Sequence, residues 1–249
     1  MDIIYTIWLR NVKRYLRSKS RIIGSLGMPI FVLLVLGFGL NSVVSVPGMS
    51  GGYVQFILPG IICMTVLFTS IFSGIQVIWD KQFGFLKETL VAPVSRTEIM
   101  IGQTLGGATT AFIQGILILI FSLIIGINTA GFNGFLIAFA FMVLIGLSFT
   151  ALGIAIASKM EDMHGFQLIM NFVIFPIFGL SGAIFPLSNL PSWLSPFTKI
   201  DPLTYGVEGI RYGLLGSSHI NPAACAIVLG SFTAIMIVTG SYFFKKIRF

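Results

Sequence analysis

Charged residues, which could take part in chemistry, are scarce in this chain and fall into a few groups. Only 9% of its 249 residues are Asp, Glu, Lys or Arg, whereas a soluble domain carries about a quarter. The densest mixed group is WDKQFGFLKETLVAPVSRTE, residues 79–98, which holds three basic and three acidic side chains. Long uncharged runs flank it on both sides. Such a stretch can cap helices or bind a partner.

Catalytic and metal-binding chemistry is not expected. The two histidines, His164 and His219, do not make a metal site, and Cys63 and Cys225 each lie in an apolar run, so no metal or disulfide framework is indicated. The serines lack triad partners. No Gly-Lys dipeptide occurs, so the chain lacks the lysine of a P-loop. We expect a protein that is not an enzyme, with no metal and no cofactor of its own.

The uncharged runs predict the elements that position the charged groups. Asp, Glu, Lys and Arg are absent from 22–79, 99–158, 163–198 and 212–244, and about 20 apolar residues cross a membrane as a helix. Turn-forming residues at 41–52 and 128–134 divide the first two runs. We predict an all-α integral membrane protein with one domain, 1–249, and six spans near 22–40, 54–78, 99–126, 134–158, 165–185 and 221–244.

The basic residues predict the orientation of these spans. Thirteen of the 15 Lys and Arg lie before span 1, between spans 2 and 3, between spans 4 and 5, or after span 6. Only Lys199 and Arg211 lie on the other side. The positive-inside rule then places both termini and residues 79–98 in the cytoplasm. The net charge of +7 therefore indicates membrane topology and contact with anionic lipid, and gives no case for nucleic acid.

Residues 1–21 suit an amphipathic helix in the membrane interface. At 100° per residue one arc is apolar and aromatic, and the opposite arc carries Arg10, Lys13, Arg14 and Arg17. The helix is either an orientation signal and lipid anchor, or a collar that also touches a cytoplasmic partner.

Residues 79–98 predict a short cytoplasmic helix joined to span 3. Trp79, Phe83, Leu86 and Leu90 share an apolar stripe, while Lys81, Phe85 and Glu88 point the opposite way. Pro93 ends this helix. Ser95 and Glu98 form a capping box for the next one. A solvated loop is the plain alternative, but the outward Phe85 favours a docking helix for a soluble partner.

The segment before span 6, residues 186–216, also predicts a helix. Asp201 suits an N-cap, Pro202 the first helical position, and Glu208 and Arg211 are spaced to pair. Trp193 and Tyr205 suit interfacial anchors. The segment is either an external gate or a structured loop with no gating role. The ion pair would contribute about 0–1 kcal/mol if exposed.

A few polar and small residues lie within the spans. The polar side chains either line a substrate path or hydrogen-bond neighbouring helices; they are Gln76, Gln103, Gln114, Gln167 and Asn171. The small residues at four-residue spacing in span 3 favour close packing within one subunit over a dimer seam; they are Gly102, Gly106, Gly107, Ala111 and Gly115.

Two motifs make the chain resemble a known family. FGFLKETLVAPVSRTEIMIGQTL, residues 83–105, is similar to the segment between spans 2 and 3 of ABC exporter permeases of the ABC-2 type. FPLSNLPSWLSPFTKIDPLTYGVEGIRYGLLG, residues 185–216, resembles the family's external segment, with Asp-Pro where many members have Asn-Pro. The likeness covers nearly the whole chain and is strongest to the daunorubicin-resistance and nodulation-factor export branch.

The resemblance implies a plasma (inner) membrane exporter subunit, prokaryotic in origin, for an amphipathic, drug-like or lipid-linked substrate. A second permease copy or paralogue would complete a dimer, and two P-loop ATPase subunits would supply ATP and Mg. Residues 80–91 would be the coupling helix, with Glu88 at an acidic position frequent in the family. The coupling set is then Lys81, Phe83, Phe85, Leu86, Glu88, Pro93, Ser95 and Glu98. Two short re-entrant helices would roof the exit, with Trp193, Asp201, Pro202, Tyr205, Glu208 and Arg211 as the gate. Gln76, Gln103, Gln114 and Asn171 are the candidate substrate path.

The residues themselves support an external motor, because the chain has no P-loop and the predicted spans hold none of the charges that serve proton relays. Three alternatives stay open. One is an exporter of lipid-linked polysaccharide within the same family. The others are an ATP-independent carrier or channel, for which sodium coupling through backbone oxygens would suffice, and a non-transporting scaffold.

Overall fold

The computed structural model describes residues 3–41, 52–86, 89, 94–127, 131–187 and 191–246. These residues form helices joined by short turns, with no strand in the part of the chain described. The helices are α1 (Ile3–Arg17), α2 (Lys19–Val32), the π-helix η1 (Leu33–Phe38), α3 (Gly52–Phe72), α4 (Ile75–Gln82), α6 (Arg96–Ile124), α7 (Gly131–Ala157), α8 (Met163–Leu180), α9 (Ser195–Ile200), α10 (Pro202–Leu215) and α11 (Pro222–Lys245).

Six helical stretches are long and apolar enough to cross a membrane, as the sequence predicts. They are Lys19–Phe38, Gly52–Gln82, Arg96–Ile124, Gly131–Ala157, Met163–Leu180 and Pro222–Lys245. The predicted bounds shift by a few residues. The N-terminal helix ends at Arg17 instead of 21, so Lys19 and Arg21 belong to the first span. The fifth span ends at Leu180, and turns follow where 181–185 was predicted to be helical.

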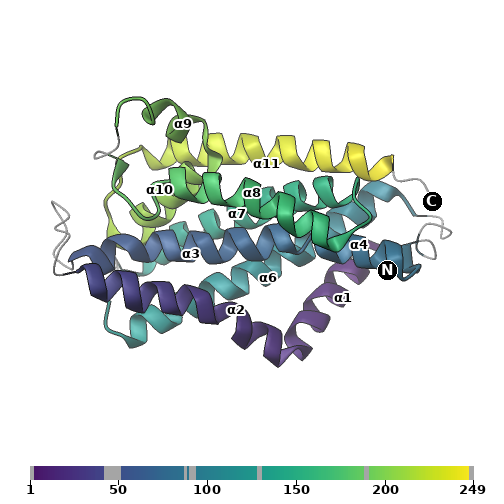
Figure 1. The fold of residues 1–249 in the computed structure, drawn as a ribbon, viewed down its shortest axis with the longest axis horizontal. Coiled ribbons are helices and arrows are strands. Elements are labelled where there is room, and N and C mark those ends of the chain that lie inside the picture. Colours follow the sequence, from purple (N-terminus) through teal and green to yellow (C-terminus); the bar gives the residue numbers. More distant parts are fainter. Residues whose placement is uncertain are drawn as a thin grey trace.

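The spans run roughly along the long axis of the molecule, and its two ends differ (Figure 1). We call the end that carries α1 and α4 the α1 end, and the end that carries α9 and α10 the α10 end. Ile3 and Lys246, the first and last described residues, both lie at the α1 end. A hydrogen bond of 2.6 Å from Arg96 to the carbonyl oxygen of Lys245 joins the start of α6 to the end of α11 there.

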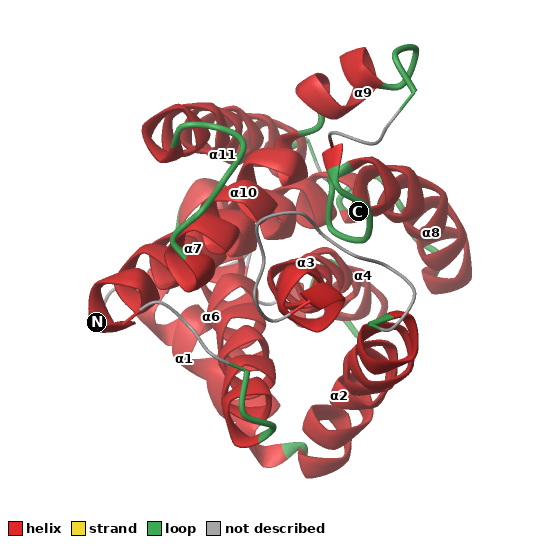
Figure 2. Cartoon of the chain, turned by 90° about the vertical axis from the view of Figure 1, so that its left-hand side faces the viewer, coloured by secondary structure: helices red, strands yellow, loops and turns green. Residues whose placement is uncertain are grey.

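α3 occupies the middle of the bundle, with the other spans around it (Figure 2). Its apolar residues are buried on all sides, and they include Phe56, Ile61 and Leu67. α2 is instead mostly exposed and buries only Pro29. A helix with so little buried surface leaves room beside it, and a cavity lies between α2 and α3.

The small residues of α6 pack within the chain, as the sequence favours. A Cβ at Gly107 would meet Ser73 and Thr150, and one at Gly115 would meet Val66 and Met142. Ala111 is fully buried. This side of α6 is therefore occupied by α3 and α7.

Candidate functional site

The segment between α4 and α6 does not form the single continuous helix that the 79–91 pattern predicts. α4 ends at Gln82, and Gly84 has φ of 78°, a left-handed backbone that interrupts a helix. Side-chain directions that were predicted from a helical spacing of 100° per residue therefore do not hold beyond Gln82. Residues 87, 88 and 90–93 lie outside the described residues; they include Lys87, Glu88, Leu90 and Pro93.

The break at Gly84 changes which side chains face outward. Phe83, predicted on the apolar stripe beside Leu86, is 79% exposed, whereas Leu86 is buried. Phe85, predicted to face outward, is only partly exposed, and the Arg10 guanidinium lies 4.1 Å from the centre of its ring. Phe83 is therefore the protruding aromatic side chain of this segment.

Lys81 also departs from the prediction that it points outward. Its Nζ donates hydrogen bonds of 2.6 Å to the carbonyl oxygen of Ser158 and 3.2 Å to that of Met160. These carbonyls follow the last turn of α7, where helix carbonyls lack intrahelical donors and carry partial negative charge. Lys81 thus fastens α4 to the end of α7.

The predicted capping box at the start of α6 is confirmed. The backbone N–H of Glu98 donates to the Ser95 hydroxyl over 3.1 Å, and the backbone N–H of Ser95 donates to the Glu98 carboxylate over 2.9 Å. Both bonds satisfy donors that the first helical turn would leave free. The start of α6 is therefore fixed locally by its own sequence.

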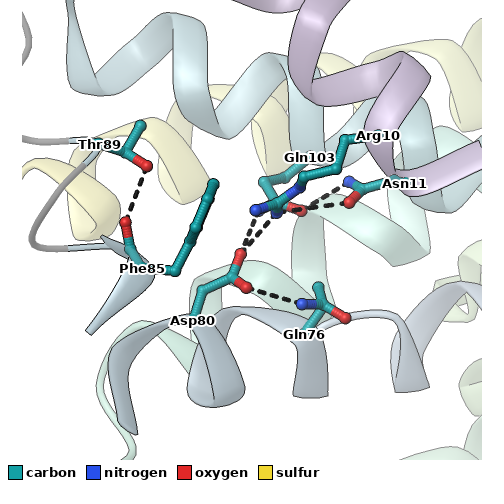
Figure 3. Close-up of polar contacts among 7 residues, drawn as sticks. All are labelled: Arg10, Asn11, Gln76, Asp80, Phe85, Thr89 and Gln103. Carbon is teal, nitrogen blue, oxygen red and sulfur yellow. Dashed lines mark hydrogen bonds and ion pairs between the residues drawn. The ribbon is translucent and has the colours of Figure 1, made fainter. Parts of the chain in front are cut away.

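The buried carboxylate of Asp80 contacts side chains from three helices, α1, α4 and α6, at the α1 end (Figure 3). Arg10 of α1 pairs with its Oδ2 over 2.7 Å, and Gln103 of α6 donates to the same oxygen over 3.0 Å. Gln76, one turn earlier in α4, donates to Oδ1 over 2.7 Å. Asn11 extends the group by donating to the Gln103 side-chain oxygen over 2.7 Å. We call Arg10, Asn11, Gln76, Asp80 and Gln103 the Asp80 cluster.

The Asp80 cluster can hold a buried charge. A buried carboxylate is costly unless it is paired and hydrogen-bonded, and here one guanidinium and two amides surround it. Arg10 also lies against Phe85, so the cluster connects α1, α4 and α6 with the segment that follows α4. A displacement of that segment would therefore be felt by α1 and α6 together.

Sequence reasoning missed Arg10 and Asp80. Arg10 was predicted on the charged arc of an interfacial helix, and Asp80 was not singled out at all. Two signals were present: Asp80 is the first charged residue after the run 22–79, and it lies four residues after Gln76, on the same helix face. The sequence did not indicate that Arg10 of α1 pairs with Asp80.

α1 packs on α6 along a face that coincides only in part with the predicted apolar arc, which included Tyr5, Tyr15 and Leu16. Tyr15 is buried as predicted, Ile7 is buried although it was not assigned to that arc, and Tyr5 and Leu16 are about half exposed. A Cβ at Gly106 would lie 2.7 Å from the Cβ of Asn11. The lack of a side chain at Gly106 thus lets α1 approach α6 closely.

The predicted substrate-path residues do not converge on one channel within the chain. Gln76 and Gln103 belong to the Asp80 cluster. Gln114, fully buried, donates to the hydroxyls of Tyr15 and Ser25. Asn171 lies exposed on α8. Gln103 and Gln114 therefore hydrogen-bond neighbouring helices, which was the other interpretation of these residues, while Gln76 bonds Asp80 within α4.

At the α10 end, the predicted start of α10 is confirmed. The Asp201 carboxylate accepts from the backbone N–H of Leu203 over 3.0 Å, and Pro202 is the first helical residue. The Tyr205 hydroxyl donates to the Lys199 carbonyl over 2.7 Å. Trp193 is 68% exposed, as suits an anchor outside the bundle. Burial of Asp201 raises the pKa of its carboxyl to about 7.

The Glu208–Arg211 pair is present but is buried, not exposed. α10 inserts between α3, α7 and α11, so the pair is withdrawn from solvent. Arg211 also donates to the carbonyl of Gly182 over 2.9 Å and lies 4.4 Å from the Phe56 ring. Glu208 accepts from the backbone N–H of His219. The pair thus joins α10 to α3 and to the turns that precede α9 and α11.

Comparisons with known proteins agree on a membrane transport family. A sequence model of the family described as "ABC-2 type transporter" matches residues 3–215. The chain is 29% identical to "Putative transport permease ycf38" of Cyanophora paradoxa, over 95% of this chain and 87% of the relative. It is 27% identical to "Nodulation protein J" of Rhizobium meliloti (strain 1021), over 93% and 91%. It is 24% identical to "Inner membrane transport permease YadH" of Escherichia coli (strain K12), over 86% and 84%.

Proposed function

This chain belongs to the ABC-2 type transporter family, and on that premise we propose that it is the membrane-spanning subunit of an ATP-driven exporter. It is a transport subunit and not an enzyme by itself. Its family associates with ABC ATPases, so ATP and Mg would bind in separate P-loop subunits. Two permease chains would form the complex, with both termini on the cytoplasmic side of a prokaryotic inner membrane, the location named for the Escherichia coli relative.

The observation that carries this proposal is the shape of the α1 end around Phe83. This exposed side chain lines a cavity of about 540 Å³, together with Arg10, Trp79, Phe85 and Met163 among others. A protruding aromatic beside a basic, partly apolar hollow suits a docking site for a soluble protein. We place the ATPase there.

Coupling would then pass through the Asp80 cluster. ATP-driven movement of the ATPase would displace Phe83 and Phe85, and Phe85 contacts Arg10 directly. Arg10 is paired with Asp80, which Gln103 connects to α6. The resulting movement of α1 and α6 would open a path for an amphipathic, drug-like or lipid-linked substrate at the interface between two permease chains. The α9–α10 segment would roof its exit.

The test is purification of the tagged full-length chain from its native host in mild detergent. We compare the wild type with Phe83→Ala, Glu88→Ala and the control Phe172→Ala, which removes an equally exposed phenylalanine from α8. Mass spectrometry then measures the amount of co-purified P-loop ATPase for each permease. We expect loss of the ATPase from the first two variants and retention in the control. A well-folded wild-type chain that brings down no ATPase would contradict the exporter assignment.

A further inference from the structure

Two adjoining cavities lie beside α2, at the α1 end of the bundle. The first, of about 40 Å³, is polar and is lined by Asn11, Arg14, Tyr15, Arg21 and Gln103 among others. The second, of about 280 Å³, lies between α2 and α3. Tyr15 and Arg21 line both cavities, so the two cavities adjoin at these side chains.

The polar cavity is suited to an anion. Among the described residues no carboxylate lines it, and neither Arg14 nor Arg21 has a carboxylate within ion-pair distance. The Asp80 carboxylate is already engaged by Arg10, Gln76 and Gln103. Arginine is the side chain best suited to bidentate hydrogen bonding with phosphate or carboxylate oxygens.

Tyr15 adds a neutral donor to the two arginines. Its buried hydroxyl accepts a hydrogen bond from the Gln114 side-chain amide, and its own proton has no acceptor among the described residues. Buried hydroxyls are usually hydrogen-bonded, and Tyr15 lines both cavities, so an oxygen atom of a ligand bound there would accept the Tyr15 proton.

The larger cavity is suited to an alkyl chain. It is lined by apolar side chains of α2 and α3, which include Met28, Pro29, Met64, Phe68 and Phe72. A single bound water needs only about 10–15 Å³ of such a cavity, so the volume of about 280 Å³ is large enough for a segment of an acyl chain. A mostly apolar pocket with a few convergent polar groups is the usual form of a ligand site.

We propose that these two cavities form one binding site for an amphiphile with a phosphate head group, which is held by Arg14, Arg21 and Tyr15, with an alkyl chain between α2 and α3. The inference that this amphiphile belongs to the exported substrate class rests on the function proposed above. Binding itself requires neither ATP nor an ATPase, so it is measured independently of that function.

The test is native mass spectrometry of the full-length chain in neutral detergent, titrated with phosphatidylglycerol, diacylglycerol or inorganic phosphate. We expect phosphatidylglycerol to bind, and diacylglycerol, which lacks the phosphate, to bind much more weakly. Inorganic phosphate should compete poorly. If it displaces the lipid at matching concentrations, the site binds soluble anions and the amphiphile proposal is wrong.

Two sets of variants locate the site. Arg14→Gln with Arg21→Gln should weaken phosphatidylglycerol binding about tenfold or more, because two charge-assisted hydrogen bonds are lost. The matched control is Lys13→Gln with Arg17→Gln, which removes the same charge from α1 outside the cavities and should leave binding unchanged. Equal loss in both double variants would mean general attraction between a basic helix and an anionic lipid, and would overturn the site.

The apolar half is tested separately. Gly24 lines the larger cavity, and a Cβ there meets no atom within 4 Å, so Gly24→Leu fills the cavity without a clash at its base. Gly27 lies in the same helix, is equally open and does not line the cavity. We expect weaker binding in Gly24→Leu and unchanged binding in Gly27→Leu. Unchanged binding in both would exclude an alkyl chain from this cavity.

Discussion

The Asp80 carboxylate is paired with one guanidinium and accepts hydrogen bonds from two side-chain amides. The stability of the α1 end should depend on these interactions. Arg10→Ala would leave the carboxylate buried with neutral donors only. We expect a loss of about 2 kcal/mol, below the value for a fully buried pair because the Arg10 side chain is 27% exposed. The measurement is thermal unfolding in detergent, compared with Arg17→Ala, which removes an exposed arginine of the same helix.

The double variant Arg10→Ala with Asp80→Asn separates charge from packing. With both charges removed, no uncompensated ion remains buried, so the double variant should be more stable than Arg10→Ala alone. If the two effects simply add, the pair does not interact as the 2.7 Å contact indicates.

Asp201 should make stability depend on pH at the α10 end. Burial raises the pKa of its carboxyl from 3.8 to about 7, so the folded chain retains a proton that the unfolded chain releases between these values. The resulting stabilisation is complete below about pH 4 and is lost as the pH rises through 7. In the variant Asp201→Asn, which keeps an N-cap, the melting temperature should fall less than in the wild type between pH 5 and pH 8.

Asp162 provides a control, because its pKa is shifted in the opposite direction to that of Asp201. This exposed N-cap of α8 accepts from the backbone N–H groups of Gly165 and His164, and these bonds lower the pKa of its carboxyl. Its contribution is lost only as the pH falls through that lowered pKa. Asp162→Asn should therefore leave the change in melting temperature between pH 5 and pH 8 as it is in the wild type. An unaltered change in Asp201→Asn would contradict the assignment.

Among the elements, α1 depends most clearly on one close approach. In Gly106→Val the new Cβ would lie 2.7 Å from the Cβ of Asn11, which is too close for two carbon atoms. We therefore expect α1 to be displaced from α6 and the Asn11–Gln103 hydrogen bond to break. We expect faster amide hydrogen exchange over residues 3–17, measured by mass spectrometry. Gly230→Val in α11, where a Cβ meets no atom within 4 Å, should leave exchange in α1 unchanged. Normal protection of α1 in Gly106→Val would show that the close approach is not required.

At the scale of the whole molecule, the two ends of the bundle should lie on opposite sides of the membrane. Cys63 and Cys225 are buried, so single exposed cysteines can be labelled selectively. Ser217→Cys at the α10 end should react with an impermeant maleimide in intact cells, while Gln82→Cys at the α1 end should react only after permeabilisation. The reverse pattern would invert the orientation predicted from the basic residues.

The sequence by itself determined the features that depend on local chemistry. Uncharged runs of sufficient length specify membrane-crossing helices, because the lipid core excludes charge and requires internal backbone hydrogen bonds. The capping box at Ser95 and the N-cap at Asp201 were predicted for the same reason, since each needs only residues within one helical turn. The two family motifs, residues 83–105 and 185–216, were readable in the same way.

Only the tertiary structure decided which charges are buried and what they meet. Arg10 and Asp80 are 70 residues apart, and no periodicity indicates that α1 packs on α6 through Gly106. The left-handed residue Gly84 leaves Phe83 exposed, away from the apolar stripe on which it was expected, and places Phe85 against Arg10. The Glu208–Arg211 pair was correctly spaced, yet its burial depends on α10 entering the bundle between other helices. These features depend on packing between segments that are distant in the sequence, so they cannot be predicted from the sequence of one segment alone.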